Sequence, residues 1–403
     1  MRIWKSRIHS QIEAIIGLEV HLRLKGAKKL FSNAEAYSFS PNSPQAIAPF
    51  DCAVPGSLPV INPECIELAT KAALALQCKI ASKLTFDRKH YFYPDLPNGY
   101  QITQYFNPFA VGGKLDLVEH DGLNKPLSVP IEQIQIEQDS AKSIKTDDDT
   151  LLDMNRAGMG IIEIVTKPEL RSSEHTVIFL KKLHQLMWYH GVTDANMDDG
   201  SFRCDVNISV RNVGNPLGNR IELKHLHKFS AIASAIDFEI ERQSALLKEG
   251  KPINQETRGF DLLTGESFIL REKEGTDEYY FIQDADIPDV NLPLEYISRI
   301  EKLLPENLDE RRRRLHQELG LSLEHVDNLM SEPGAVEYFE QFLILLQSPN
   351  YEAKSLVNWV TGELMGMLHK EKLKISESPV GAEKLAALVD LVLEQKVSGI
   401  LVF

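Results

Sequence analysis

Two residues on one face of a short strand are the first that could bind a metal. Residues 16–24 have an apolar side chain at every second position, which predicts a β-strand with Glu19, His21 and Arg23 on one face. A carboxylate oxygen beside an imidazole nitrogen can hold a divalent cation, although two ligands alone do not make a site. The pattern therefore indicates either part of a metal site or an ordinary exposed strand face.

A second alternating pattern places a densely charged face on residues 201–211. Apolar residues alternate there with Arg203, Asp205 and further polar residues. A turn rich in Gly, Asn and Pro follows, and residues 220–224 then resume the alternation, with Lys224 at the end. Alternation that resumes after a turn predicts an antiparallel hairpin with one charged face.

One carboxylate interrupts a run of apolar residues. Glu163 lies within residues 160–165, which are otherwise apolar. A charge buried in such a run needs an opposite charge or a metal ion beside it. The residue therefore indicates either a metal ligand or an ion pair with an arginine such as Arg156 or Arg171.

Residues 133–142 read as a strand that ends in a polar cluster. The period of two places Glu137 on the face opposite Ile134 and Ile136, and Asp139 follows. This ending indicates either a functional site or a strand that simply runs into a loop.

The segment 86–95 is unusually dense in aromatic and basic residues. Arg88 and Lys89 could contact a phosphate, and Tyr91 and Tyr93 could hydrogen-bond or stack. A partly buried turn is the alternative, but this density favours a functional segment.

No nucleotide-binding motif accompanies these residues. No G-x-G-x-x-G follows a predicted strand, and no G-x-x-x-x-G-K-[ST] occurs. Oxygen and imidazole ligands suit Mg²⁺ or Mn²⁺, and basic side chains suit phosphate. The residues by themselves thus predict a polar sheet face that could hold ATP with a divalent cation.

The elements that must position these residues change in kind near residue 290. Strand and helix patterns alternate before this point, and only helical patterns follow it. We therefore expect an α+β fold, with a mostly antiparallel sheet domain over residues 1–290 and an all-α domain over residues 291–395. The expected helices span residues 63–78, 173–190, 230–249, 294–304, 307–319, 322–331, 334–347, 352–371 and 380–395.

Composition narrows the class of protein. With 403 residues, 43% hydrophobic and 25% charged, the chain is typical of a soluble globular protein of two or three domains. It has neither an 18-residue apolar run nor an apolar leader, so we expect a cytoplasmic protein without a membrane partner. A net charge of −14 argues against non-specific nucleic-acid binding, so we expect no DNA partner.

Two local features have ordinary explanations. Four consecutive arginines at 311–314 could form a basic patch, but such runs more often lie on a solvated helix face. The four cysteines have no zinc-binding spacing and are expected to be free thiols in a reducing compartment.

Eight stretches of the chain resemble, in the same order, the B subunit of the tRNA-dependent amidotransferases of bacteria and organelles. The stretches are residues 16–24, 55–62, 86–105, 136–143, 153–172, 200–211, 221–229 and 255–261. The resemblance is strong over residues 14–290 and looser over the helical part. It identifies residues 1–290 as the family's catalytic cradle domain.

The resemblance implies a carbon–nitrogen ligase that works in a heterotrimer. In this family an A subunit releases ammonia from glutamine, and a small C subunit ties the assembly together. The B subunit uses ATP and Mg²⁺ to phosphorylate the side-chain carboxylate of mischarged Glu-tRNA(Gln), Asp-tRNA(Asn) or both. Ammonia then displaces the phosphate.

The family motifs also imply roles for single residues. Glu19, His21 and Glu163 match metal-site positions, and Gln138 stands where many members have a further glutamate ligand. The expected catalytic residues are Lys89, Tyr91, Glu137, Arg203 and Asp205, and the expected contacts to ATP come from Arg88, Arg203 and Lys224.

Three departures from the family pattern leave alternatives open. The segment that holds a four-cysteine zinc in some relatives lacks those cysteines, so we expect no structural zinc. Tyr280 stands where relatives usually have an arginine, and residues 396–403 stop at the threshold of a tail domain of roughly a hundred residues, which suggests a truncated chain. One alternative is thus a remnant that binds the A subunit without transamidation. The other is a free-standing ATP-dependent amine ligase acting on a small carboxylate.

Overall fold

A computed structural model describes residues 12–36, 46–194, 197, 200–226, 228–272, 279–348 and 351–397. The chain divides into two compact units, Met1–Leu304 and Pro305–Phe403. The first unit is rich in strands and the second is helical, so the predicted α+β class is confirmed. The predicted domain boundary at residue 290 stays a prediction. The predicted start of a tail domain at residues 396–403 also stays a prediction, and most of these residues lie outside the described ones.

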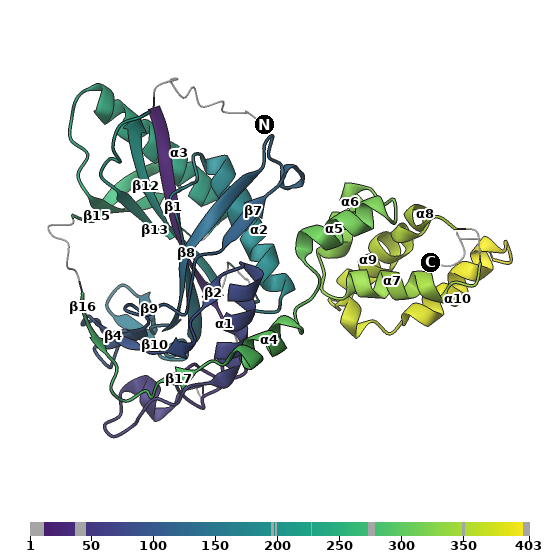
Figure 1. The fold of residues 1–403 in the computed structure, drawn as a ribbon, viewed down its shortest axis with the longest axis horizontal. Coiled ribbons are helices and arrows are strands. Elements are labelled where there is room, and N and C mark those ends of the chain that lie inside the picture. Colours follow the sequence, from purple (N-terminus) through teal and green to yellow (C-terminus); the bar gives the residue numbers. More distant parts are fainter. Residues whose placement is uncertain are drawn as a thin grey trace. The chain divides into compact units, whose positions relative to one another are not determined.

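One large, mostly antiparallel sheet organises the first unit (Figure 1). In the described part of the chain, β13 and β14 are the neighbouring strands of this sheet that run parallel to each other. The strands lie in the order β15 (Glu266–Glu272), β14 (Glu256–Asp261), β13 (Ile221–Leu226), β12 (Phe202–Asn212), β1 (Ile12–Arg23), β11 (Gly160–Thr166), β8 (Leu127–Gln138), β6 (Ala110–Val111) and β2 (Lys79–Ile80), and β7 (Lys114–Leu117) also pairs with β8.

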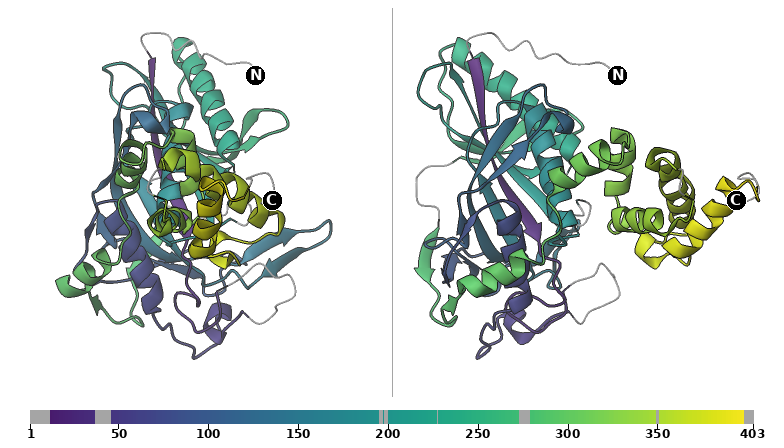
Figure 2. Two further views of the ribbon diagram at one scale, coloured as in Figure 1. Left: turned by 90° about the vertical axis from the view of Figure 1, so that its right-hand side faces the viewer. Right: turned by 45° about the vertical axis from the view of Figure 1, so that its right-hand side comes forward.

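The two faces of this sheet differ, as the alternating patterns predict. Residues such as Leu18, Val20, Val206 and Ile208 are fully buried on the apolar face. Helices α2 (Ser173–Tyr189) and α3 (Phe229–Lys248) pack against each other, and α3 packs against β12 and β13 (Figure 2). Burial of this apolar face is the main favourable term in folding, and it leaves the polar side chains of the same strands on the other face.

Helix α1 (Pro63–Ala75) begins as its sequence predicts. The Asn62 side chain accepts a hydrogen bond from the backbone N–H of Glu64 at 3.0 Å, and Pro63 takes the first helical position. Such an N-cap satisfies a donor that the helix cannot pair internally. Helix α4 (Leu294–Glu301) packs against α1 and so belongs to the first unit.

Smaller sheets complete the first unit. The one that matters for the site has the order β16 (Tyr280–Gln283), β4 (Asp87–His90), β5 (Tyr100–Thr103). The others pair β17 (Val290–Asn291) with β3 (Lys83–Leu84) and β10 (Thr150–Asp153) with β9 (Lys142–Lys145).

The second unit consists of helices, each close to its predicted span. They are α5 (Leu308–Gln317), α6 (Leu323–Met330), α7 (Ala335–Leu345), α8 (Ala353–Asn358), a π-helical turn (Trp359–Leu364), α9 (Met365–Lys370) and α10 (Ala382–Leu393). None of the described helices combines the length and the apolar composition that a membrane-spanning helix needs.

Two of the four arginines in the run on α5 are buried, and Arg313 is exposed. Arg311 and Arg312 are each only 8% exposed, and their side chains form ion pairs with Glu337 at 2.6 Å and Asp327 at 3.3 Å. The expectation of a solvated helix face is therefore wrong for these two residues. Their charges organise the helical unit instead of offering a basic patch.

Candidate active site

The predicted polar face forms at the centre of the large sheet, where β1 lies between β11 and β12. His21 lies opposite Glu163 of β11 on one side and Arg203 of β12 on the other. Glu19 lies opposite Asp205 of β12. Because side chains alternate along a strand, these residues all project from the face opposite the buried apolar side chains.

The first group of potential metal ligands consists of His21, Glu137 and Glu163, here called the His21 cluster. One ligand atom of each residue lies within 4.8 Å of the other two, and His21 Nε2 is 3.3 Å from Glu163 Oε1. The side chains of His21 and Glu163 are 20% and 16% exposed, so the group is shielded but reachable. One imidazole nitrogen and two carboxylates form a donor set that fits Mg²⁺ or Mn²⁺.

Electrostatics tie the members of this cluster to one another. Burial lowers the pKa of His21, but its hydrogen bond to Glu163 and the charge of Glu163 outweigh that effect and raise the pKa to about 8. Burial alone would raise the pKa of Glu163, and the His21 partner brings it below its ordinary value. Burial also raises the pKa of Glu137, and the charge of Glu163 adds to this effect. Without a cation, His21 therefore carries a proton that partly neutralises the two carboxylates.

Two residues of β5 hold Glu137 in place. Thr103 Oγ1 donates to Glu137 Oε1 at 2.5 Å, and Gln101 Nε2 donates to Glu137 Oε2 at 3.2 Å. Neither residue was predicted from the sequence. Their strand is short and belongs to a different sheet, so no local pattern points to this contact.

The second group consists of Glu19, Asp205 and Glu222, here called the Glu19 cluster. One oxygen atom of each lies within 4.8 Å of the others. Lys224 Nζ contacts Asp205 Oδ2 at 3.2 Å and Glu222 Oε1 at 2.9 Å. Burial lowers the pKa of Lys224, but these two carboxylates raise it above its ordinary value, so the ammonium group is retained. Glu222 could have been predicted, because it shares the alternating face with Lys224.

Lys89 of β4 lies opposite Gln101 of β5, whose side chain donates to Glu137, so Lys89 projects from the same face toward the His21 cluster. The positive charge of Lys89 opposes the effect of burial on the pKa of both Glu137 and Glu163. Lys89 Nζ also lies 4.5 Å from the centre of the Tyr279 ring. Tyr91 is mostly buried, and this burial raises the pKa of its hydroxyl well above its ordinary value. The catalytic roles expected for Lys89 and Tyr91 stay predictions.

Arg88 does not join this group. Its Nε donates to Asp284 and its Nη2 to Asp286, each at 2.7 Å. Adjacent residues of a strand point to opposite faces, so Arg88 turns away when Lys89 turns inward. The structure thus places Arg88 in a local ion-pair network and not beside the clusters.

Arg203 joins the polar face through Asp139, the residue that follows β8. Its Nη2 donates to Asp139 Oδ1 at 3.1 Å. The charge of Asp139 raises the pKa of Arg203 more than burial lowers it. Arg156 Nε lies 3.7 Å from the same carboxylate and donates to the carbonyl of Ser140, which fixes the end of the strand.

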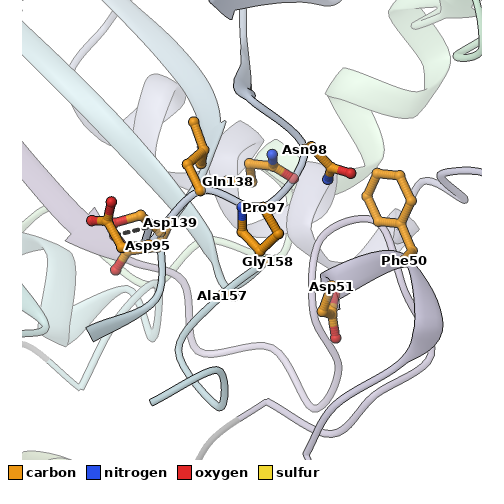
Figure 3. Close-up of a pocket in the computed structure, with 11 residues that line it drawn as sticks. Phe50, Asp51, Asp95, Pro97, Asn98, Gln138, Asp139, Ala157 and Gly158 are labelled. Carbon is orange, nitrogen blue, oxygen red and sulfur yellow. Dashed lines mark hydrogen bonds between the residues drawn. The ribbon is translucent and has the colours of Figure 1, made fainter. Parts of the chain in front are cut away.

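Gln138 is separated from the His21 cluster. It follows Glu137 in β8, and consecutive side chains of a strand project to opposite faces. Figure 3 shows Gln138 in a small pocket with Asn98 and Pro97, and Asp51 also lines this pocket. The structure therefore brings Glu137, and not Gln138, together with His21 and Glu163.

The His21–Glu163 pair predicts a pH dependence for the metal-free chain. The pKa of His21 is raised from 6.5 to about 8 in the folded state, so its contribution to stability is complete below pH 6.5 and is lost as the pH rises through 8. We expect the wild type to lose about 2 kcal/mol more than His21→Gln between pH 6 and pH 9. Urea unfolding in the presence of a chelator measures this difference. Equal losses in the two proteins would contradict the pairing.

Two family models match most of the chain. Residues 14–298 match the family described as the GatB/GatE catalytic domain, and residues 337–402 match a family described as the GatB domain. The first match contains all the residues of the two clusters.

Curated relatives extend the similarity to most of the chain. The B subunit of the mitochondrial glutamyl-tRNA(Gln) amidotransferase of Naegleria gruberi is 41% identical over 96% of this chain and 76% of its own length. The B subunits of the aspartyl/glutamyl-tRNA(Asn/Gln) amidotransferases of Rhodopseudomonas palustris (strain ATCC BAA-98 / CGA009) and Ehrlichia canis are each 40% identical over 96% of this chain, and over 78% and 79% of their own lengths. The chain therefore belongs to the family of the GatB/GatE catalytic domain, as the B subunits of these amidotransferases do.

Proposed function

We propose that this protein is the B subunit of a tRNA-dependent amidotransferase. Its substrates are ATP, ammonia from an A subunit, and the side-chain carboxylate of Glu-tRNA(Gln), Asp-tRNA(Asn) or both. The observation that carries the proposal is the His21 cluster with Lys89 beside it, in a chain that belongs to the family.

The reaction needs two displacements. An oxygen of the substrate carboxylate forms a bond to the γ-phosphorus of ATP, and ADP leaves. Ammonia then forms a bond to the acyl carbon, phosphate leaves, and a proton passes to solvent or a neighbouring base. Phosphoryl transfer depends mainly on positioning and on neutralisation of charge, and both clusters and the nearby cations supply these.

The chain's own residues divide this work. His21, Glu137 and Glu163 would hold one divalent cation, and Glu19, Asp205 and Glu222 would hold a second. When bound, the cation would neutralise charge on the phosphates. Lys89 would contact the substrate carboxylate or the transferred phosphoryl group. Arg203 and Lys224 each form an ion pair with a carboxylate of the chain. They would contact the substrate while these ion pairs hold their side chains in place.

An aromatic surface next to Lys89 supports the proposal that the substrate has a single-stranded nucleic-acid end. Aromatic rings on β16 and on the segments that follow β4 and β5 are exposed to solvent: Phe92, Tyr93, Tyr105, Phe106 and Tyr280. Phe92 is 87% exposed, and the Tyr105 ring stacks on Phe281 with ring centres 3.9 Å apart. Aromatic rings stack on unpaired bases. The aminoacyl group of a charged tRNA is attached to such an unpaired 3′ end.

The experiment that tests the proposal is ADP formation with different carboxylates. The protein is combined with its A and C partner subunits, Mg²⁺ and ATP, and receives Glu-tRNA(Gln), uncharged tRNA or free glutamate. We expect ADP formation with Glu-tRNA(Gln) alone. Turnover of free glutamate would instead indicate a free-standing ligase, and no turnover with any substrate would indicate a remnant.

A further inference from the structure

Asn207 of β12 lies on the polar face next to the Glu19 cluster. It lies opposite Glu222 of β13 on one side and opposite Gly17 of β1 on the other. Its Nδ2 donates a hydrogen bond to Glu19 Oε1 at 2.8 Å. Asn207 is therefore a neutral amide among carboxylates.

The chemistry of the contact fixes the orientation of the amide. A carboxylate only accepts hydrogen bonds, so the amide nitrogen, and not its oxygen, must face Glu19. The other amide atom, Asn207 Oδ1, is buried and has no hydrogen-bond partner among the described residues. The hydrogen bond to Glu19 thus holds the amide group of Asn207. It leaves the buried Oδ1 acceptor without a hydrogen bond, which is unfavourable.

The rest of the cluster offers Glu19 no comparable support. Asp205 and Glu222 are themselves acceptors that repel it. Lys224 contacts both of those carboxylates, and the ion pairs found in the described part of the chain do not link it to Glu19. A glutamate side chain has three rotatable bonds, and ordering it beside like charges is unfavourable without a donor. Asn207 supplies this donor.

We propose that Asn207 is a positioning residue that holds the Glu19 carboxylate in the orientation needed to bind a divalent cation at the Glu19 cluster. The proposal rests on the proposed function, which makes this cluster a cation site, and it adds a residue that touches no substrate itself. Partners that orient a ligand in this way change metal affinity by about 10- to 100-fold when removed.

The test is Mn²⁺ binding by the full chain, without tRNA or ATP, followed through the electron paramagnetic resonance signal of free Mn²⁺. Four variants are compared with the wild type: Asn207→Leu, Glu19→Gln, the double variant, and Ser209→Ala. Ser209 is the matched control, because it is the next residue on the same face of β12 and lies outside both clusters. Asn207→Ala also removes the amide donor and provides the same comparison if the leucine variant does not fold.

We expect Asn207→Leu to weaken, by about tenfold, the binding step that Glu19→Gln also weakens, and Ser209→Ala to leave it unchanged. In the Glu19→Gln background, Asn207→Leu should have no further effect, because its role acts through Glu19. Wild-type affinity in Asn207→Leu, or an equal additional loss in the double variant, would overturn the proposal alone. A wild-type chain that binds no Mn²⁺ would overturn the cation site itself and with it this part of the proposed function.

Discussion

Glu163→Gln is expected to lower the rate of amide formation on Glu-tRNA(Gln) by at least about a hundredfold. The substitution keeps the shape of the side chain but removes the charge that pairs with His21 at 3.3 Å and that would bind the cation. The pKa of His21 should fall as a result, because the raising effect of Glu163 is lost. The rate of Gln-tRNA formation in the presence of the A and C subunits measures the effect.

Glu169→Gln is the matched control for this prediction. Glu169 follows the same strand, is exposed, and pairs at 3.2 Å with Arg171 at the surface. Surface ion pairs contribute little, so this variant should keep wild-type activity. Release of ammonia by the A subunit should be unchanged in both variants. A Glu163→Gln protein that retains more than a tenth of the wild-type rate would contradict the assignment of Glu163.

Asp51→Ala is expected to destabilise the first unit by about 3–5 kcal/mol. Lys29 Nζ and Asp51 Oδ2 are 3.0 Å apart, and their side chains are 0% and 1% exposed. Asp51 Oδ2 also accepts hydrogen bonds from Ser32 and from the backbone of Ala48. Removing the carboxylate leaves a buried ammonium group without its partner. The free energy of unfolding, measured with urea, gives the size of the effect.

A double variant separates this charge effect from simple loss of packing. Lys29→Met with Asp51→Leu replaces both charges by apolar side chains, which often restores most of the stability of a buried pair. We therefore expect the double variant to be more stable than Asp51→Ala. An Asp51→Ala protein within about 1 kcal/mol of the wild type would show that the buried pair contributes little.

The helices were predictable because their signals are local. Asn62 and Pro63 mark the start of α1, and Gly191 marks the end of α2, where its backbone has a positive φ of 65°. The alternating pattern likewise placed Glu19 and His21 on one face of β1. These signals depend on neighbouring residues in the sequence, and the structure contains the helix ends and the strand face that they predict.

The grouping of the site residues could not be predicted in the same way. Glu19 and His21 share a strand face, yet they join different clusters because their neighbours on β11, β12 and β13 differ. Strand order and register connect residues more than a hundred positions apart, and no local pattern encodes them. Thr103 was missed for the same reason. The alternation did place Asn207 on the charged face, but its contact with Glu19, 188 residues away in the sequence, was not predictable.

Gln138 and Arg88 show where the resemblance outweighed a local signal. The period of two already placed Glu137 on the polar face of β8 and Gln138 on the apolar one. The same rule separates Lys89 from Arg88 in β4. The alternation of side chains along each strand, applied to both segments, would have favoured Glu137 and Lys89 as partners of His21.

The most direct test of the proposed function is amide formation itself. This chain, the A and C partner subunits, glutamine, ATP and Mg²⁺ are incubated with Glu-tRNA(Gln), and the amino acid released from the tRNA is identified. Glutamine on the tRNA, absent when ATP or this chain is omitted, is the predicted result. Glutamate alone, from a complex that assembles and still releases ammonia from glutamine, would contradict the proposed activity.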